Sequence, residues 1–283
     1  MDAILLCMKK SGIRFFKNIK FQNTDVTRFH AKNNFLGLLH TRVREFDNIL
    51  LMAHGSSKAI LTTTHDLNHP YVVYISADEV SAFKNDFVFA VSCSTANEFG
   101  KCCVDEGAIA YLGYQVELGC LFYSYTGKNS NVPKRITTAV DTIIKRIFLE
   151  ELSRAYEEFL KNPYSVCVLR ERFSYLLEKR IAQLTSMSAA QLYEEYSIKI
   201  TERDYKNFVV EIVLRVLSYL DDILPRLVCI GDENYISASY ITYRKRDGVN
   251  LKALSEELES NKAFQALNHD GYKQHLREIV TKS

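Results

Sequence analysis

Several common signatures of function are absent from the sequence. None of its seven cysteines belongs to a Cys-x-x-Cys pair, so neither a disulfide framework nor a zinc site is predicted. There is no Gly-x-Ser-x-Gly elbow, no cysteine has an arginine six positions later, and Gly127-Lys128 lacks the earlier glycine of a phosphate-binding loop. No apolar stretch approaches the length of a membrane span. The sequence therefore does not indicate an elbow-type serine hydrolase, a cysteine phosphatase, a P-loop enzyme or a membrane-spanning protein.

Charge and compartment signals are equally sparse. The formal net charge of the 283 residues is +2, so overall charge predicts no class of partner. Residues 1–50 carry nine Lys or Arg against four Asp or Glu, and for this excess we prefer a solvated surface over an acidic partner. Scattered thiols fit a reducing compartment, and an apolar run precedes Lys9 and Lys10, the reverse of a signal peptide. We therefore expect a cytoplasmic protein that binds no membrane and no nucleic acid directly.

The first half of the chain alternates strand and helix patterns. Hydrophobic residues make up 47% of the sequence, enough for a large core in one large domain or two small ones. Apolar β-rich runs predict strands, and apolar residues at helical spacing predict helices. In chain order we expect a strand at 3–8, a strand or hairpin arm at 13–22, a helix at 31–46, a strand ending at His54, a hairpin from 59–64 and 70–75, a helix starting at Ser76, a strand at 86–93, a helix at 95–106 and a strand at 108–114. This alternation is typical of an α/β fold with a mainly parallel central sheet.

The second half is mostly helical. Four helices are predicted between residues 133 and 225, the third of which begins at the capping box of Ser188 and Gln191. The fourth ends before Pro225, since proline interrupts a helix. Residues 226–232 return to strand character, and we expect them to be the last strand of the same sheet, with the helices inserted before it.

The remainder is interpreted as an appended segment. Residues 235–244 are predicted to form a further strand, and the polar residues after them are predicted to be helical. The expected organisation is one domain over 1–235, with a helical insert at about 133–225, followed by a short C-terminal extension over 236–283.

Two of the predicted strands end abruptly in reactive side chains. Residues 47–54 lead to His54, and residues 86–93 lead to Cys93. The carboxyl ends of neighbouring parallel strands lie at one edge of the sheet, where ligands bind. A thiol is mostly protonated near neutral pH, and a neighbouring imidazole can take its proton and later protonate a leaving amine. The working hypothesis is a cysteine hydrolase with His54 as general base and Cys93 as nucleophile.

Gly55 is a candidate for binding the carbonyl oxygen of the substrate. Because it has no side chain to block a carbonyl, its backbone N–H is a candidate oxyanion-hole donor together with the N–H of Cys93. The alternative is that His54 is a satisfied histidine of the core or its edge and Cys93 a small buried residue. For either residue alone we prefer that alternative. The position of both at strand ends, with glycine after the histidine, favours the catalytic pair.

Other candidates have less support. His65 and His69 are four residues apart, as metal-binding histidines on one helix face are, but they lie in a predicted turn, so no metal is expected. The adjacent Cys102 and Cys103 are interpreted as helix packing and not as a redox pair. We therefore expect no cofactor.

At these residues the sequence resembles the caspase-like cysteine peptidases, and within them the CHAT family. In that family a His-Gly pair ends one strand, and a hairpin and a short helix with an acidic start follow. Next come a strand ending in a Ser-Cys motif, a Gly-Ala strand, and a closing strand that leads to Gly-Asp. The corresponding stretches here are 53–55, 76–80, 91–96, 107–113 and 228–232. The likeness covers roughly residues 1–235 and is densest at 48–117.

The resemblance implies a caspase–haemoglobinase fold, a three-layer α-β-α arrangement around a mainly parallel sheet. It also implies hydrolysis of a protein substrate by a dyad of His54 and Cys93, with the N–H groups of Gly55 and Cys93 as oxyanion hole. Many prokaryotic relatives belong to defence or cell-death systems. This implies a regulated protease with a regulatory protein partner or activator.

The specificity pocket does not follow from the resemblance. Caspases carry Gln two residues before the catalytic cysteine and metacaspases often carry Asp, whereas this chain has Val91. Cleavage after Asp, after Arg or Lys, or after another residue therefore stays open. Gln115 and Glu117, just past the Gly-Ala strand, are candidate substrate-binding residues. Residues 118–132 are interpreted as a plain connection, in preference to a mobile active-site loop or a self-cleavage segment.

A second hypothesis has the same fold and no catalysis. In it the chain is a scaffold or adaptor that docks partner proteins through the insert at 133–225 and the tail at 236–283. The two hypotheses differ in the chemistry of Cys93, which only the first requires.

Overall fold

A six-stranded sheet with the strand order β2-β1-β3-β7-β8-β9 forms the centre of the fold. The structure is a computed structural model, and it describes residues 3–7, 14–22, 24, 26–41, 47–63, 71–122 and 132–282. The strands are β1 Ala3–Cys7, β2 Val26–Phe29, β3 Asn48–Met52, β7 Phe87–Val91, β8 Ala110–Tyr114 and β9 Leu227–Gly231. The first five pair in parallel, and β9 runs antiparallel to β8. The expected α/β fold with a mainly parallel sheet is confirmed, and so is the place of 226–232 as a further strand of this sheet.

The strands β3, β7 and β8 are buried along their whole length. A strand that is covered on both faces has no solvent-facing side, so its sequence is continuously apolar and does not alternate. This explains why the runs at 48–52, 87–91 and 110–114 were recognisable as strands.

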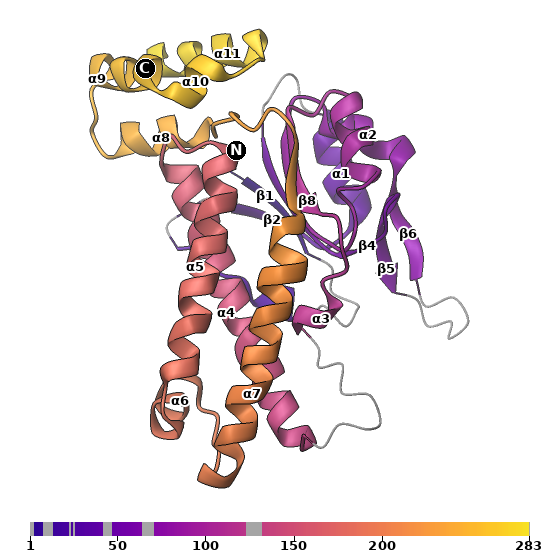
Figure 1. The fold of residues 1–283 in the computed structure, drawn as a ribbon. Coiled ribbons are helices and arrows are strands. Elements are labelled where there is room, and N and C mark those ends of the chain that lie inside the picture. The colour runs from indigo at the N-terminus through magenta and orange to yellow at the C-terminus, as the bar shows by residue number, and fades with distance from the viewer. Residues whose placement is uncertain are drawn as a thin grey trace.

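Helices cover both faces of the sheet (Figure 1). One face carries α1 Lys32–Thr41, the 3-10 helix η2 Ala77–Phe83 and α2 Phe99–Asp105, and the other carries α4 Lys134–Lys161 and α5 Val166–Ser186. The ring of Phe89 in β7 lies 6.3 Å from that of Phe173 in α5. On the opposite face, Tyr111 of β8 lies 6.2 Å from Phe99 of α2. The core therefore has two apolar layers with the sheet between them.

A second, three-stranded sheet has the order β4-β5-β6 and was not predicted as a separate sheet. It consists of β4 His54–Gly55, β5 Ala59–Thr63 and β6 Tyr71–Ser76. β5 and β6 pair antiparallel, which confirms the expected hairpin, while the turn at 65–69 lies outside the described residues. The expected helix start at Ser76 is observed as η2, where the Glu79 carboxylate accepts a hydrogen bond from the Ser76 N–H at 3.0 Å.

The helical region after residue 133 agrees with the sequence pattern. It contains α4, α5, α6 Ala189–Tyr196 and α7 Glu202–Ser218. After Ser218 the chain continues as a π-helical turn, η3 Tyr219–Ile223, and then as a 3-10 turn, η4 Leu224–Arg226, which contains Pro225. The capping box is present, with the Gln191 N–H donating to Ser188 Oγ and the Ser188 N–H donating to Gln191 Oε1. Although α4 has 28 residues, none of the helices in the described part of the chain has the apolar length that a bilayer span needs.

The C-terminal segment packs on the core and departs from the predicted strand at 235–244. It contains α8 Ser239–Arg246, α9 Leu251–Ser260, α10 Lys262–Ala266 and α11 Asp270–Thr281. The strand prediction was wrong because aromatic and β-branched residues favour strands locally, whereas Tyr240 and Tyr243, three residues apart, are both buried in α8. The expected helical character of the remaining tail is confirmed.

The N-terminal region contains two further departures. Residues 14–18 form a 3-10 helix, η1 Arg14–Asn18, so the strand predicted at 13–22 was wrong. Phe16 and Ile19 are three residues apart, and both are buried. Phe16 lies 5.9 Å from Phe122. This side-chain packing fixes the turn, and within the described part of the chain residues 14–18 belong to neither sheet. The edge strand β2 was not predicted from the sequence. The helix expected at 31–46 is observed over 32–41, and residues 42–46 lie outside the described residues.

Candidate functional site

The ends of β3 and β7 bring His54 and Cys93 to one edge of the sheet. The two strands are parallel neighbours with Met52 opposite Val91, the last residue of each. The pairing continues one step further, since the Ala53 N–H donates to the Val91 carbonyl oxygen at 3.4 Å. Each candidate residue then follows its strand by two positions. The juxtaposition expected from the sequence is therefore present in the backbone.

His54 is held by the small sheet. It pairs with Leu61 in β5, and its ring lies 5.0 Å from the ring of Tyr71 at the start of β6, in an edge-to-face arrangement. The His54 Nε2 atom is buried and has no hydrogen-bond partner within the described part of the chain. Burial lowers the pKa of the imidazole from its ordinary value of 6.5. His54 is therefore neutral near pH 7, the state in which it can accept a proton.

Gly55 makes the closest contact between the two halves of the site. A Cβ atom at this position would lie 2.4 Å from Ser92 Oγ and 2.5 Å from the Cys93 carbonyl oxygen. Such distances are far below van der Waals contact, so only glycine lets β4 lie against the turn that begins at Cys93. This close approach is a structural reason for Gly55 that the sequence did not reveal. Its predicted role as an oxyanion donor stays a prediction.

Cys93 begins a turn that follows β7 and is pinned by the segment after β8. The half-buried sulfur accepts a hydrogen bond from the Leu118 N–H at 3.3 Å, and the cysteine is not in a disulfide. The next residue, Ser94, has a φ of 57°, a left-handed conformation that is uncommon outside glycine. Its N–H donates to the Val116 carbonyl oxygen at 3.0 Å. An N–H donor aimed at sulfur stabilises a thiolate, the nucleophilic form.

The candidate pocket residues Gln115 and Glu117 lie in this same pinning segment. The carbonyl oxygen of Gln115 accepts from Asn97 Nδ2 at 3.0 Å, and its N–H donates to the Arg226 carbonyl oxygen at 2.9 Å. Gln115 is half-buried and Glu117 is exposed. The fold therefore places both residues within the segment that contacts the Cys93 turn. Their role in substrate binding stays a prediction.

Sequence reasoning missed two contributors to the site. The Leu118 N–H is a backbone group, and no residue type signals that it will reach Cys93 from a segment 25 positions away. Tyr71 contacts His54 across the small sheet, and its aromatic character at the start of a predicted strand was the only available signal. Both contacts depend on chain pairing between segments distant in sequence.

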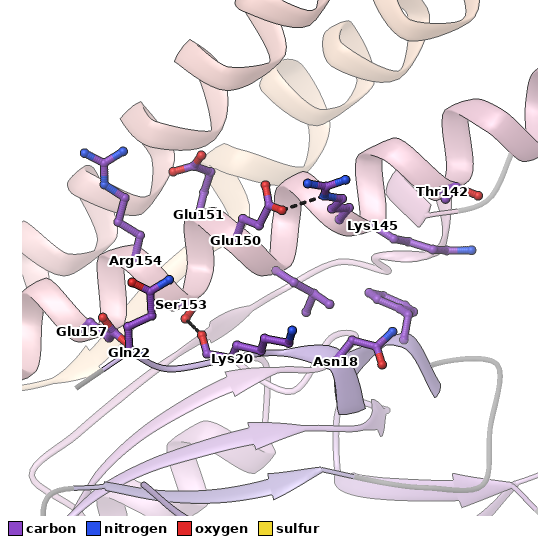
Figure 2. Close-up of a pocket in the computed structure, with 13 residues that line it drawn as sticks. Asn18, Lys20, Gln22, Thr142, Lys145, Glu150, Glu151, Ser153, Arg154 and Glu157 are labelled. Atoms are coloured by element: carbon purple, nitrogen blue, oxygen red, sulfur yellow. Dashed lines mark hydrogen bonds and ion pairs between the residues drawn. The ribbon is translucent and has the colours of Figure 1, made fainter. Parts of the chain in front are cut away.

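A cavity lies in another part of the molecule, away from His54 and Cys93. It has a volume of about 1010 Å³ and lies between α4 and the segment from Phe15 to Gln22 (Figure 2). Lys20, Lys145 and Arg154 are interleaved with carboxylates on its wall. Burial raises the pKa of Glu157, which also lines it. None of the lining residues belongs to the His54–Cys93 site.

Metal coordination has no support in the described part of the chain. Within it, no three residues among His, Cys, Asp and Glu are grouped so that they can hold a metal ion. His65 and His69 lie outside the described residues, as do residues 123–131 of the 118–132 connection. Residues 119–122 of that connection form a short helix, α3 Gly119–Phe122.

Comparison with known proteins adds no assignment to this geometry. No protein-family model matches the sequence, and no curated protein matches it. A functional proposal for this chain therefore depends on the residues and contacts described above.

Proposed function

We propose that the chain is a caspase-like cysteine endopeptidase in which His54 is the general base and Cys93 the nucleophile. The observation that carries the proposal is the close approach of Gly55 to the Cys93 turn, because it joins the histidine-bearing and cysteine-bearing segments. The order of elements is further support. After His54-Gly55 come the β5–β6 hairpin, η2 with Asp78 and Glu79 in its first turn, and β7 ending before Cys93. β8 and β9 complete the sequence of elements that the family likeness implies.

The proposed reaction uses the chain's own groups. Neutral His54 takes the proton of the Cys93 thiol, and the thiolate attacks the carbonyl carbon of a peptide bond. The N–H groups of Gly55 and Cys93 bind the oxygen that gains negative charge. The protonated imidazole then gives its proton to the leaving amine, which breaks the C–N bond and leaves a thioester on Cys93. Water, deprotonated by His54, cleaves the thioester and regenerates the thiol.

Thiol labelling tests this proposal. A peptidyl electrophile is expected to modify Cys93, because the Leu118 N–H donates to its sulfur and His54 is the proposed base for its proton. The other described thiols are internal comparators. Burial raises the pKa of the thiols of Cys103, Cys167 and Cys229, that of Cys229 to about 12. The modified cysteine is identified by peptide mass spectrometry, with rates measured across pH.

The histidine variant makes the labelling test specific. His54→Ala is expected to slow labelling of Cys93 by about 100-fold, the usual scale of a general base, whereas His40→Ala at an exposed position of α1 leaves the rate unchanged. In the wild type, labelling is expected to slow only as pH falls through the pKa of His54, which burial lowers from its ordinary value, because a protonated imidazole cannot accept the thiol proton. Equal rates in the two variants, or no labelling of Cys93 under any condition, would contradict the proposal.

A scaffold without catalysis is the second candidate, and one observation favours it. The buried His54 Nε2 has no hydrogen-bond partner among the described residues, so this atom is not bonded to the Cys93 thiol. A comparison of protein N-termini in cells that carry the wild type or Cys93→Ala separates the candidates. New N-termini that depend on Cys93 support the peptidase, and a Cys93→Ala chain with full biological function supports the scaffold. The regulated role in a prokaryotic defence or cell-death system is part of the same proposal and rests on the family likeness alone.

A further inference from the structure

The outer face of α7 carries a continuous apolar stripe. Val210, Val213, Leu214 and Leu217 have exposed fractions of 48%, 39%, 57% and 50%, and their spacing places them on one side of the helix. Single exposed apolar residues are ordinary, but a contiguous stripe marks an interaction surface. The opposite side of α7 is already used, since Phe208 and Ile212 are fully buried. In Figure 1, α7 lies on the outside of the helical arm that it forms with α4, α5 and α6.

Charged residues of opposite sign flank the stripe. Arg203 and Lys206 are exposed before it, and Asp221 and Asp222 are exposed after it. Within the described part of the chain, neither Lys206 nor Asp221 forms an ion pair. The first turn of α7 also carries Glu202 and Asp204, the latter paired with Arg135 of α4. The charges next to the stripe are therefore Lys206 before it and Asp221 after it.

This pattern is complementary to itself when one copy is reversed. Consider two α7 helices that run antiparallel about a two-fold axis between Val213 and Leu214. Val213 then faces Leu214 of the second copy, and Val210 faces Leu217 of the second copy. The same register places Lys206 opposite Asp221 of the second copy. A parallel pair would instead oppose like charges at both ends.

We propose that the outer face of α7 binds the same face of a second copy of this chain in an antiparallel, two-fold symmetric dimer. The register that centres the apolar stripe is also the one that pairs the opposite charges, and an unrelated partner would require no such agreement. The 17 residues of α7 span about 25 Å. A single helix pair of this length offers less contact than the roughly 800 Å² per partner of a standard stable interface. The dimer is therefore reversible and dissociates on dilution. The proposal is independent of any activity of Cys93.

Sedimentation of the full chain tests the dimer. Between about 5 μM and 500 μM, the wild type is expected to shift from the 32.6 kDa monomer to twice that mass. Leu214→Glu is expected to weaken association by about 100-fold or more, because each dimer then buries two carboxylates at its centre. Tyr193→Glu, at a site of α6 that is 58% exposed, is the matched control and leaves association unchanged. Circular dichroism checks that both variants keep the fold.

A charge exchange tests the register. Lys206→Asp and Asp221→Lys each place like charges opposite one another and are expected to weaken the dimer several-fold at low salt. The double variant restores opposite charges and is expected to recover the affinity of the wild type. A wild type that stays monomeric at about 500 μM, a dimer that survives Leu214→Glu, or a double variant no better than the singles would each overturn the proposal. So would hydrogen exchange that shows the α7 face covered in a monomer.

Discussion

The candidate catalytic residues are positioned by backbone contacts from other segments. The Cys93 sulfur accepts from the Leu118 N–H, and the Gly55 backbone lies against the turn from Ser92 to Thr95. His54 is positioned by its strand pairing with Leu61. A site built in this way is sensitive to small changes in chain path, since a shift of β4 moves the imidazole relative to the thiol.

Gly55→Ala is expected to lower the free energy of unfolding by about 1–3 kcal/mol, because the added methyl group overlaps Ser92 and Cys93 and the turn must shift. Gly37→Ala is the matched control. It lies within α1, where a Cβ meets nothing within 4 Å, and alanine stabilises a helix interior by roughly 0.5–1 kcal/mol relative to glycine. Urea unfolding of the three proteins gives the comparison. A Gly55→Ala protein as stable as the wild type would contradict the requirement for glycine at this contact.

At the scale of elements, α7 is attached to the rest of the molecule through a buried cation. Arg215 has a side-chain exposure of 6%, and it donates to Asp141 of α4 at 2.6 Å, to Glu211 at 3.2 Å and to the Leu121 carbonyl oxygen at 3.0 Å. These contacts join α7 to α4 and α3. They also fix which side of α7 faces inward, and so which side presents the apolar stripe.

Arg215→Ala is expected to lower the free energy of unfolding by about 3–5 kcal/mol, because it removes a buried guanidinium that pairs with both Glu211 and Asp141. Arg203→Ala removes a guanidinium from an exposed position of the same helix and is expected to change stability by less than about 0.5 kcal/mol. Chemical unfolding followed by circular dichroism measures both. Similar losses in the two variants would show that the Arg215 network adds little to the attachment of α7.

For the whole molecule, the C-terminal helices are part of the folded body. Tyr272 of α11 stacks on Tyr235 at a centroid distance of 4.8 Å, and its hydroxyl donates to the Ile236 carbonyl oxygen at 2.5 Å. Tyr235 in turn donates to the side chain of Asn48 in β3 at 3.1 Å. A chain of contacts thus leads from the last helix to a central strand. Removing one of these contacts is therefore expected to destabilise the sheet and the C-terminal helices together.

Tyr272→Ala is expected to destabilise the protein by about 3–5 kcal/mol. The midpoint of unfolding is expected to fall in a single transition that all probes report together. The sequence has no tryptophan, so near-ultraviolet circular dichroism of its tyrosines reports tertiary packing, and the far-ultraviolet signal reports helix. Tyr193→Ala, whose side chain is 58% exposed, is the matched control and leaves the transition almost unchanged. A separate early transition for the tail would indicate that it folds independently of the sheet.

The sequence by itself determined the features that depend on local patterns. Continuous apolar runs marked β3, β7 and β8 because strands buried on both faces need apolar residues throughout. Helical spacing and capping residues marked α4 to α7 for an equally local reason. The end positions of His54 and Cys93 followed from the same runs, since parallel neighbours end at one edge.

Only the tertiary structure decided the features that depend on contacts between distant segments. The 3-10 helix at 14–18 and the helix at 239–246 replaced predicted strands because burial of their side chains outweighed local preference. The edge strand β2, the separate β4-β5-β6 sheet and the Leu118 N–H at the Cys93 sulfur had no local signal. Gly55 belongs to both categories. Its place after His54 was evident from the sequence, but the need for glycine arises from a turn nearly forty residues further along the chain, which only folding brings within reach.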